Sequence, residues 1–127
     1  MQENLLAKKY PLRLVSFDAR TRNVGMEKRT PHCRLDRVQA LIAQGKVRVT
    51  GTALRGAAGL GLDVHGMLAV VGSLSRRDFY KSMTTHADHQ VWQDVYRPAT
   101  PAGPIYLKLT VIDDVLIVSF KALGDDS

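Results

Sequence analysis

The sequence has one cysteine, few aromatic residues and no long apolar run. Cys33 alone cannot form an internal disulfide or a multi-cysteine zinc site, so the composition indicates a reducing compartment rather than a disulfide-built secreted domain. No stretch approaches the roughly eighteen consecutive apolar residues that a membrane-spanning helix needs. Residues 1–25 also lack the apolar segment of a signal peptide, and Glu3 and Asp18 interrupt a transit-peptide composition. We therefore expect a cytoplasmic protein that does not enter a membrane.

The chain has 127 residues in ordinary globular proportions, which suits one domain around a single core. Eighteen Lys and Arg residues against twelve Asp and Glu give a formal net charge of +6. Such an excess attracts polyanions, including nucleic acids, over long range. Residues 1–25 hold five basic and two acidic residues and so carry +3 of that charge. Charge alone does not identify the partner.

Residues 1–25 differ in pattern from the rest of the chain, because they carry Pro11 and show no sustained hydrophobic period. We interpret them as an N-terminal extension and residues 26–127 as the single domain. The extension has three interpretations that the sequence leaves open. It is a flexible basic arm, an extra edge strand over residues 12–17, or the product of a misassigned start, with Met26 as the initiator.

Hydrophobic spacing predicts helices in the first half of the domain. Apolar residues recur at helical spacing from Thr30 and Pro31 to Gly45, and again over residues 67–74. A short strand over residues 47–49 and a brief helix over residues 50–54 are expected between them. Ser75 and Asp78 have the spacing of a capping box, which predicts a further helix over residues 76–83.

After residue 85 the period changes to two, which predicts strands over residues 89–97, 105–112 and 115–121. The predicted fold is α+β, with N-terminal helices packed on a C-terminal antiparallel β-sheet meander.

A two-residue turn at Asp113 and Asp114 predicts which side chains share a face of the last hairpin. It pairs Leu107 with Phe120, Leu109 with Val118, Val111 with Leu116, and Tyr106 with Lys121. The face carrying Leu107, Leu109, Val111, Leu116, Val118 and Phe120 is apolar and should pack on the helices. The other face carries Tyr106, Lys108, Thr110, Ser119 and Lys121. Placing Arg97 opposite Pro104 puts Gln93 opposite Lys108 on the polar face, whereas a shift of one residue would move Gln93 to the other side.

A phenol, two ammonium groups and a carboxamide on one open face form a positive surface that suits a phosphodiester. A solvated sheet face is the alternative, because lysines on exposed strands also discourage aggregation.

Four stretches carry a resemblance to a known family. They are Met26-Glu-Lys-Arg-Thr-Pro-His32, Asp78-Phe-Tyr-Lys-Ser-Met-Thr-Thr85, Trp92-Gln-Asp-Val-Tyr-Arg-Pro98 and Val111-Ile-Asp-Asp-Val-Leu-Ile-Val-Ser-Phe-Lys121. From Met26 to Lys121 the chain resembles the motility quorum-sensing regulator (MqsR) family of type II toxins, which are mRNA interferases similar to RelE-type ribonucleases. The resemblance implies a RelE-like toxin fold for the domain. Family members can carry Tyr where this chain has His86, and His where it has Asp113.

The resemblance also implies a function. It is that of a ribosome-independent and metal-independent endoribonuclease that needs no cofactor, cuts mRNA at short GC-containing sites, and thereby inhibits translation and growth. The implied partners are mRNA and a cognate antitoxin that binds zinc and DNA, so that operator DNA is bound only through the antitoxin. The family's catalytic positions correspond here to Lys81, Gln93, Tyr106 and Lys121. The first of these comes from the predicted helix over residues 76–83, and the other three from the polar sheet face.

Cleavage by this route needs the ribose 2′-hydroxyl aimed at the phosphorus, charge stabilisation on the phosphoryl oxygens, and a proton for the leaving 5′-oxygen. Lys81 and Lys121 are candidates for charge stabilisation, Tyr106 for proton exchange or orientation, and Gln93 for positioning the phosphate or a base. For Tyr106 we expect a phenol pKa lowered by the neighbouring Lys121 ammonium.

Arg97 and Lys108 are further RNA-binding candidates that would contact phosphates. Trp92 is expected to pack in the core rather than to stack on a base. His86 and His89 lack an evident third ligand, so no metal site is expected.

Two other functions stay open at this stage. A noncatalytic RNA-binding or regulatory module would retain the toxin fold and the antitoxin interface without cleaving RNA. A general DNA-binding regulator has less support, because no helix-turn-helix with a basic recognition helix is apparent.

Overall fold

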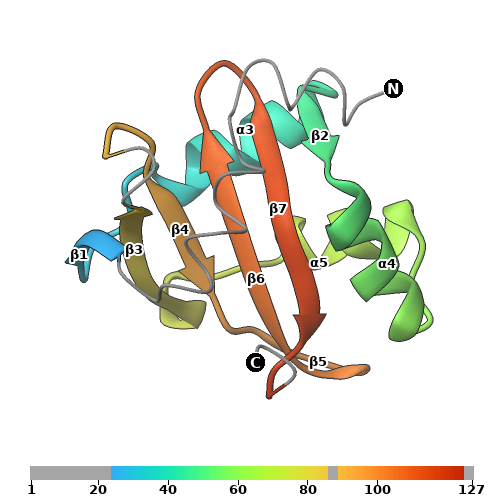
Figure 1. The fold of residues 1–127 in the computed structure, drawn as a ribbon. Coiled ribbons are helices and arrows are strands. Elements are labelled where there is room, and N and C mark those ends of the chain that lie inside the picture. The colour runs from blue at the N-terminus through green and yellow to red at the C-terminus, as the bar shows by residue number, and fades with distance from the viewer. Residues whose placement is uncertain (1–23, 86–88, 125–127) are drawn as a thin grey trace.

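The computed structural model describes residues 24–85 and 89–124, so the strand expected over residues 12–17 and most of the expected extension lie outside the described residues. The elements follow the chain in this order: β1 (Val24–Lys28), α3 (Leu35–Ala43), β2 (Val47–Val49), α4 (Gly51–Gly59), α5 (Val64–Gly72), the 3₁₀ turn η1 (Arg76–Asp78), β3 (Phe79–Thr85), β4 (Gln93–Tyr96), β5 (Ala99–Thr100), β6 (Gly103–Val111) and β7 (Val115–Ala122) (Figure 1).

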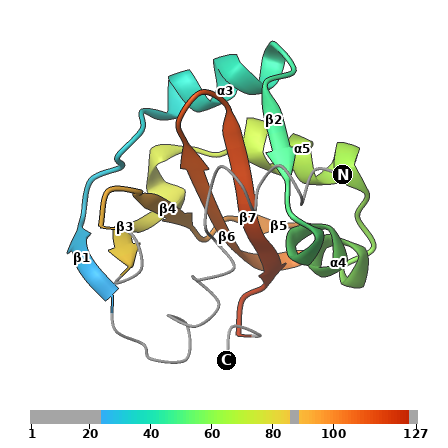
Figure 2. The ribbon, with the colours of Figure 1, turned by 45° about the horizontal axis from the view of Figure 1, so that its top comes forward.

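The described part of the chain forms one mixed sheet with strand order β1-β3-β4-β6-β7-β2, and the short β5 pairs with β6. β2 runs parallel to β7, and the other pairs are antiparallel. Figure 2 shows β1 and β2 at opposite edges of this sheet. The predicted α+β class is confirmed, and the sheet gains β1 and β2 beyond the three strands of the expected meander.

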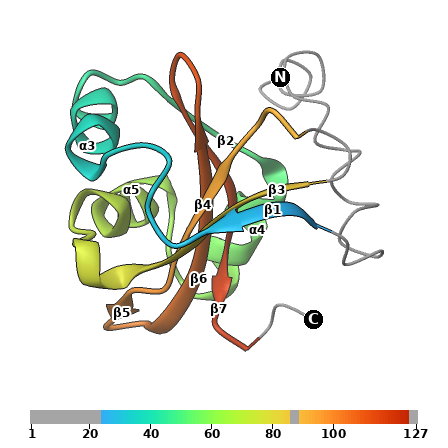
Figure 3. The ribbon, with the colours of Figure 1, turned by 90° about the vertical axis from the view of Figure 1, so that its left-hand side faces the viewer.

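The helices cover one face of the sheet, and Figure 3 shows α3 and α5 together on that side. A buried core cluster joins the helices to the sheet through Val38 of α3, Ala57 of α4 and Met67 of α5. Leu107 and Phe120 enter the same cluster from β6 and β7. No single helix among the described residues is long and apolar enough to span a membrane, and only α4 and α5 together, bent by 93°, pass that test.

The first helix begins later than its sequence signals indicate. α3 starts after Arg34 rather than at Thr30 and Pro31. The buried carboxylate of Asp94 on β4 accepts hydrogen bonds from the backbone N–H groups of His32 (2.9 Å) and Cys33 (3.0 Å). Because these donors bond to the sheet, the segment before Leu35 is a loop that fastens α3 to β4.

The second helix is longer than expected, since α4 reaches Gly59 rather than ending near Leu54. Thr50 caps its first turn, with the side-chain oxygen accepting from the Ala53 N–H at 3.0 Å. Small residues let α4 lie directly on β7. A Cβ added at Gly56 would stand 1.9 Å from the backbone oxygen of Phe120. The α4–β7 contact therefore depends on the absence of a side chain at Gly56.

The predicted helix over residues 76–83 is wrong. The capping-box contacts exist, because the Ser75 N–H donates to the Asp78 carboxylate at 2.8 Å, but they close only the η1 turn. The chain continues as β3 between β1 and β4. Aromatic and β-branched residues favour this strand, and two neighbouring strands supply its hydrogen bonds. Tertiary pairing thus overrides the local helix signal.

The β6–β7 hairpin matches the predicted register at its open end, where Leu107 pairs with Phe120 and Tyr106 with Lys121. Nearer the turn the prediction is wrong by one residue, because a β-bulge at Val118 shifts the register. The observed pairs there are Leu109 with Ile117, Thr110 with Leu116, and Val111 with Val115. Val115 and Ile117 therefore enter the core in place of Leu116 and Val118. The bulge presents the Val118 carbonyl to the Thr50 hydroxyl, which donates to it at 2.9 Å.

The β4–β6 register differs from the prediction by two residues. Ala99 pairs with Pro104 and Thr100 with Gly103, so the chain reverses at residues 101 and 102. As a result Val95 rather than Gln93 lies opposite Lys108. A shift of two preserves the alternation of side chains, so the predicted face of Gln93 is retained.

Candidate functional site on the sheet face

A row of cross-strand partners places two lysines on the face opposite the core. Lys81 of β3 pairs with Val95 of β4, Val95 pairs with Lys108 of β6, and Lys108 pairs with Ser119 of β7. Directly paired residues in antiparallel strands share a face. Two strand spacings separate Lys81 from Lys108, which is about 10 Å between their Cα atoms. Lys81 thus reaches this face from a strand, not from the helix that the sequence predicted.

A β-bulge at Tyr80 is what turns Lys81 away from the core. The register shifts between Phe79 and Lys81, so the two residues face opposite sides of the sheet although they are two positions apart. Phe79 packs against the core and meets Tyr96 edge to face, with ring centroids 5.5 Å apart. Without the bulge, alternation would put Lys81 and Phe79 on the same face.

The neighbouring row adds a phenol and a third ammonium group. Tyr106 and Lys121 are direct partners in β6 and β7, and the Lys121 Nζ lies 5.6 Å from the Tyr106 ring centroid. Tyr106 and Lys108 are two positions apart on β6, so both rows lie on one face. We call this surface, made by Lys81, Lys108, Lys121 and Tyr106, the lysine face.

Gln93 lies on the same side of the sheet, two positions before Val95, and pairs with Met83 of β3. Its side chain is 1% exposed, and its Oε1 atom accepts no hydrogen bond within the described part of the chain. Buried acceptors without a partner are rare in native proteins. The Gln93 Oε1 atom can therefore accept a hydrogen bond from a further donor at the border of the lysine face.

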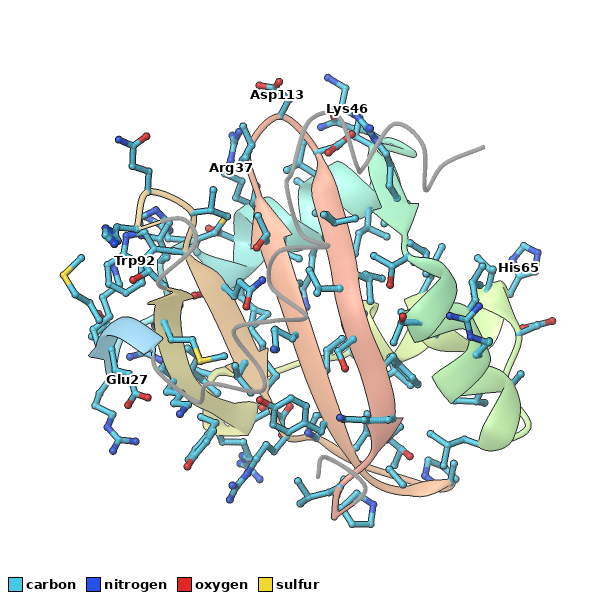
Figure 4. All side chains as sticks on the ribbon, in the orientation of Figure 1. Glu27, Arg37, Lys46, His65, Trp92 and Asp113 are labelled. Carbon is cyan, nitrogen blue, oxygen red and sulfur yellow. The ribbon has the colours of Figure 1, made fainter. Side chains whose placement is uncertain are left out.

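An acidic residue from the sheet edge orients Lys81. The Lys81 Nζ donates to the carboxylate of Glu27 on β1 at 2.8 Å, and the two side chains are 20% and 38% exposed. Figure 4 shows Glu27 beside β1 at this edge. The ion pair restricts the position of the ammonium group.

Arg97 extends the positive surface beyond the end of β4. Its guanidinium lies 4.1 Å from the ring centroid of Tyr80, and the same ring has the Lys81 Nζ at 5.4 Å and the Arg29 guanidinium at 5.9 Å. Arg97 itself is exposed. This cluster of cations around an aromatic ring borders the lysine face at Lys81.

Lys108 has the most perturbed ammonium group of the face. Burial, followed by the charges of Lys121 and Lys81, lowers the pKa of Lys108 to about 8. Both causes disfavour the charged form of a lysine. Lys121 and Lys81 are thus both close enough to act on the Lys108 ammonium group.

Trp92 is not part of the core, contrary to the prediction. Its ring stacks on the His32 ring, with centroids 5.4 Å apart, and the Lys28 Nζ lies 4.2 Å above it. Figure 4 shows Trp92 at the β4 side of the sheet, away from His65 near α4. Burial and the Lys28 charge lower the pKa of His32, although Asp94 acts in the opposite direction. This stack covers the loop before α3 rather than the lysine face.

The described residues contain no group of three or more His, Cys, Asp or Glu side chains arranged to hold a metal ion. His86 lies outside the described residues, and His65 and His89 are exposed. Burial and the nearby Asp94 carboxylate raise the pKa of the half-buried Cys33 thiol.

The structure brings Tyr106, Lys108, Lys121 and Lys81 onto one face, with Gln93 and Arg97 at its borders. Sequence reasoning missed Glu27, although it lies in the first of the four family-like stretches. Pairing Glu27 with β3 requires β1, a strand that the sequence pattern did not reveal.

The fold and this face together define a small α+β protein with a positively charged sheet surface. Comparison with known proteins identifies one family. The profile of the family described as "Motility quorum-sensing regulator, toxin of MqsA" matches residues 30–122. The mRNA interferase toxin MqsR of Escherichia coli (strain K12) is 62% identical over 96 residues, which cover 76% of this chain and 98% of that protein. The chain therefore belongs to the MqsR toxin family.

Proposed function

We propose that this chain is the toxin of a type II toxin–antitoxin system and acts as an endoribonuclease that cleaves mRNA. The observation that carries the proposal is the row from Lys81 to Lys108, with Tyr106 and Lys121 beside it, on the face of the sheet opposite the core. Membership of the MqsR family and the similarity to a relative named as an mRNA interferase support it.

The proposed reaction is attack of the ribose 2′-hydroxyl on the adjacent phosphorus. It releases a 5′-hydroxyl and leaves a 2′,3′-cyclic phosphate. The catalytic residues are Lys81, Gln93, Tyr106 and Lys121. Lys81 and Lys121 stabilise the charge that develops on the phosphoryl oxygens, and they gain strength because they act in a fixed geometry.

Gln93 and Tyr106 supply hydrogen bonds rather than charge. The Gln93 Oε1 atom is free to accept from a base or a ribose hydroxyl, as its unpaired state in the described structure suggests. Tyr106 orients the phosphate or exchanges a proton beside Lys121. Arg97 and Lys108 are the proposed additional RNA contacts.

The finer properties of the reaction follow the family resemblance. We propose that cleavage needs neither ribosome, metal ion nor cofactor and occurs at short GC-containing sites, and that residues 26–127 form the toxin domain. The proposed inhibitor is a cognate antitoxin that binds zinc and DNA. The family description, which names a toxin of MqsA, supports an antitoxin partner.

The test is cleavage of a defined single-stranded RNA by the purified chain in the presence of a chelator. The parent should cut at discrete GC-containing sites, and the Lys81→Ala, Lys121→Ala double variant should lose at least about 100-fold in rate, because both charge-stabilising groups are removed. Lys46→Ala is the matched control, since Lys46 is exposed at the start of β2, far from the lysine face (Figure 4).

Equal cleavage by the parent and the double variant would remove the lysines from the mechanism. A folded parent that binds RNA without cutting it would contradict the ribonuclease proposal and leave a noncatalytic RNA-binding module.

A further inference from the structure

Lys108 lies at the centre of the lysine face, which distinguishes it from the other basic residues. β6 is an interior strand with β4 on one side and β7 on the other. Across β4 the next residue in the same row is Lys81, and on β7 the diagonal neighbour is Lys121. A phosphodiester that contacts both outer lysines must therefore pass over Lys108.

The surroundings of Lys108 lower the proton affinity of its amine. The side chain is half-buried, and its two charged neighbours, Lys81 on β3 and Lys121 on β7, are both cations. A lysine that is desolvated or placed beside other cations gives up its proton far more readily than a free lysine, and becomes a base near neutral pH. Lys81 differs, because its Nζ is paired with the Glu27 carboxylate at 2.8 Å.

We propose that Lys108 is a catalytic residue of the RNA-cleavage reaction, the base that takes the proton from the ribose 2′-hydroxyl. This role goes beyond phosphate contact and rests on the proposed ribonuclease function. Charge stabilisation by Lys81 and Lys121 and positioning by Gln93 remain as described, and Lys81 is in addition the acid of this step.

The step balances in protons and electrons. The neutral Lys108 amine takes the 2′-hydroxyl proton, and the oxygen's electron pair forms the bond from O2′ to phosphorus. The bond from phosphorus to O5′ breaks with its electron pair on O5′, which takes a proton from the Lys81 ammonium. Lys108 ends as an ammonium and Lys81 as an amine, and exchange with water restores both. Base and acid come from strands on either side of β4, as an in-line reaction requires.

The pH dependence of this step is set by every charged group around Lys108. Burial and the two cations favour the neutral amine, whereas an arriving phosphate favours the ammonium. Three titratable groups lie next to Lys108 on the lysine face: Lys81 of β3, Lys121 of β7 and Tyr106 of β6. Two further charged groups lie one contact away, near Lys81: Arg97 after β4 and Glu27 of β1.

Lys108→Arg separates a base from a phosphate contact. Arginine keeps the positive charge and the capacity to bind phosphate but cannot be deprotonated in a protein. We expect Lys108→Arg to bind a non-cleavable 2′-deoxy-substituted RNA within about threefold of the parent, and to cleave the matching RNA about 100-fold more slowly or worse. Lys108→Met, which removes both charge and base, should lose binding as well as cleavage. Circular dichroism checks that both variants fold.

The pH profile provides a second measurement. The parent's kcat/KM should rise about tenfold per pH unit and flatten near pH 8, where Lys108 of the free enzyme titrates. The Arg and Met variants should lose that rise, and a small primary amine in the buffer should restore part of the Met variant's cleavage. Lys46→Arg serves as the control and should behave as the parent.

Two results would overturn the assignment. A Lys108→Arg variant that cleaves as fast as the parent would reduce Lys108 to a phosphate contact while leaving the ribonuclease function intact. A parent that binds RNA but cuts none would overturn the proposed function, and this role with it.

Discussion

Lys81, Lys108 and Lys121 lie on strands β3, β6 and β7 of one sheet, where their charges repel. Lys108 lies between the other two, so the repulsion destabilises its ammonium form the most. The pKa of Lys108 falls because burial and the charges of Lys121 and Lys81 oppose its ammonium form. Groups arranged for chemistry commonly reduce the stability of the folded state in this way. The cost should be measurable without any substrate.

Lys108→Met should therefore stabilise the folded chain at pH 7, by about 1 to 3 kcal/mol. In the unfolded chain Lys108 keeps its proton up to its ordinary pKa of 10.5, whereas in the folded chain it releases the proton near pH 8. Between these values the unfolded state binds more protons, so the free energy of unfolding of the parent rises with pH. The advantage of the Met variant should thus be complete below pH 8 and shrink as pH approaches 10.5. Urea unfolding at several pH values measures it.

Lys46→Met supplies the matched control for this experiment, because Lys46 is exposed and lies outside the lysine face. It should change the free energy of unfolding little at any of these pH values. A Lys108→Met variant that is less stable than the parent at pH 7 would contradict the strained environment assigned to Lys108.

At the scale of elements, the lysine face depends on how closely α4 packs against β7. Gly56 allows this approach, because an added Cβ would meet the Phe120 carbonyl oxygen at 1.9 Å. The Phe120 carbonyl oxygen belongs to the backbone of β7, so it cannot rotate aside as the end of a side chain could. Phe120 is the neighbour of Lys121, so the same strand segment supports both the core and the site.

Gly56→Ala should lower the free energy of unfolding by at least about 1 to 3 kcal/mol, the usual cost of overpacking. Gly59→Ala is the matched control in the same helix. Its added Cβ would have no atom within 4 Å, and alanine is the better helix former, so the control should be neutral or more stable by up to about 1 kcal/mol. Thermal or urea unfolding of the two variants checks both expectations. Equal stability of the two would contradict the close contact between α4 and β7.

The element scale also shows what the sequence could reveal. Apolar spacing found the helices and most strands, and alternation placed Tyr106, Lys108 and Lys121 on one face, because both depend on local periodicity. Residues 76–83 were predicted as a helix because the capping box of Ser75 and Asp78 is a local signal. The pairing of β3 with β1 and β4 depends on residues distant in the sequence. Lys81 therefore entered the site only through the family resemblance.

The two β-bulges had no signal in the sequence. The bulge at Tyr80 turns Lys81 onto the lysine face, and the bulge at Val118 brings Ile117 into the core while Ser119 and Lys121 stay on the opposite side. A bulge reverses the alternation of every residue beyond it, so counting residues from a turn cannot locate side chains across one. The prediction for Tyr106 and Lys121 was right because the extra residue at Val118 cancels the one-residue error at the turn.

At the scale of the whole molecule, the charge distribution suits a polyanion. The formal net charge is +6, and Lys81, Lys108, Lys121 and Arg97 gather on or beside one surface. Contact between these cations and RNA phosphates releases counterions, so the affinity should fall as salt rises. The three lysines of the face together with Arg97 can neutralise up to four phosphates, which sets the size of the salt effect.

We expect the logarithm of the association constant for a non-cleavable single-stranded RNA to fall linearly with the logarithm of salt concentration, with a slope of about −3. This value follows from about −0.7 per phosphate for single strands and four contacts. Lys121→Ala should reduce the magnitude of the slope by about 0.7, because one contact is lost, whereas Lys46→Ala should leave it unchanged. Fluorescence anisotropy at several salt concentrations measures all three slopes. If Lys46→Ala and Lys121→Ala change the slope equally, RNA binds through the overall charge of the protein and not through the lysine face.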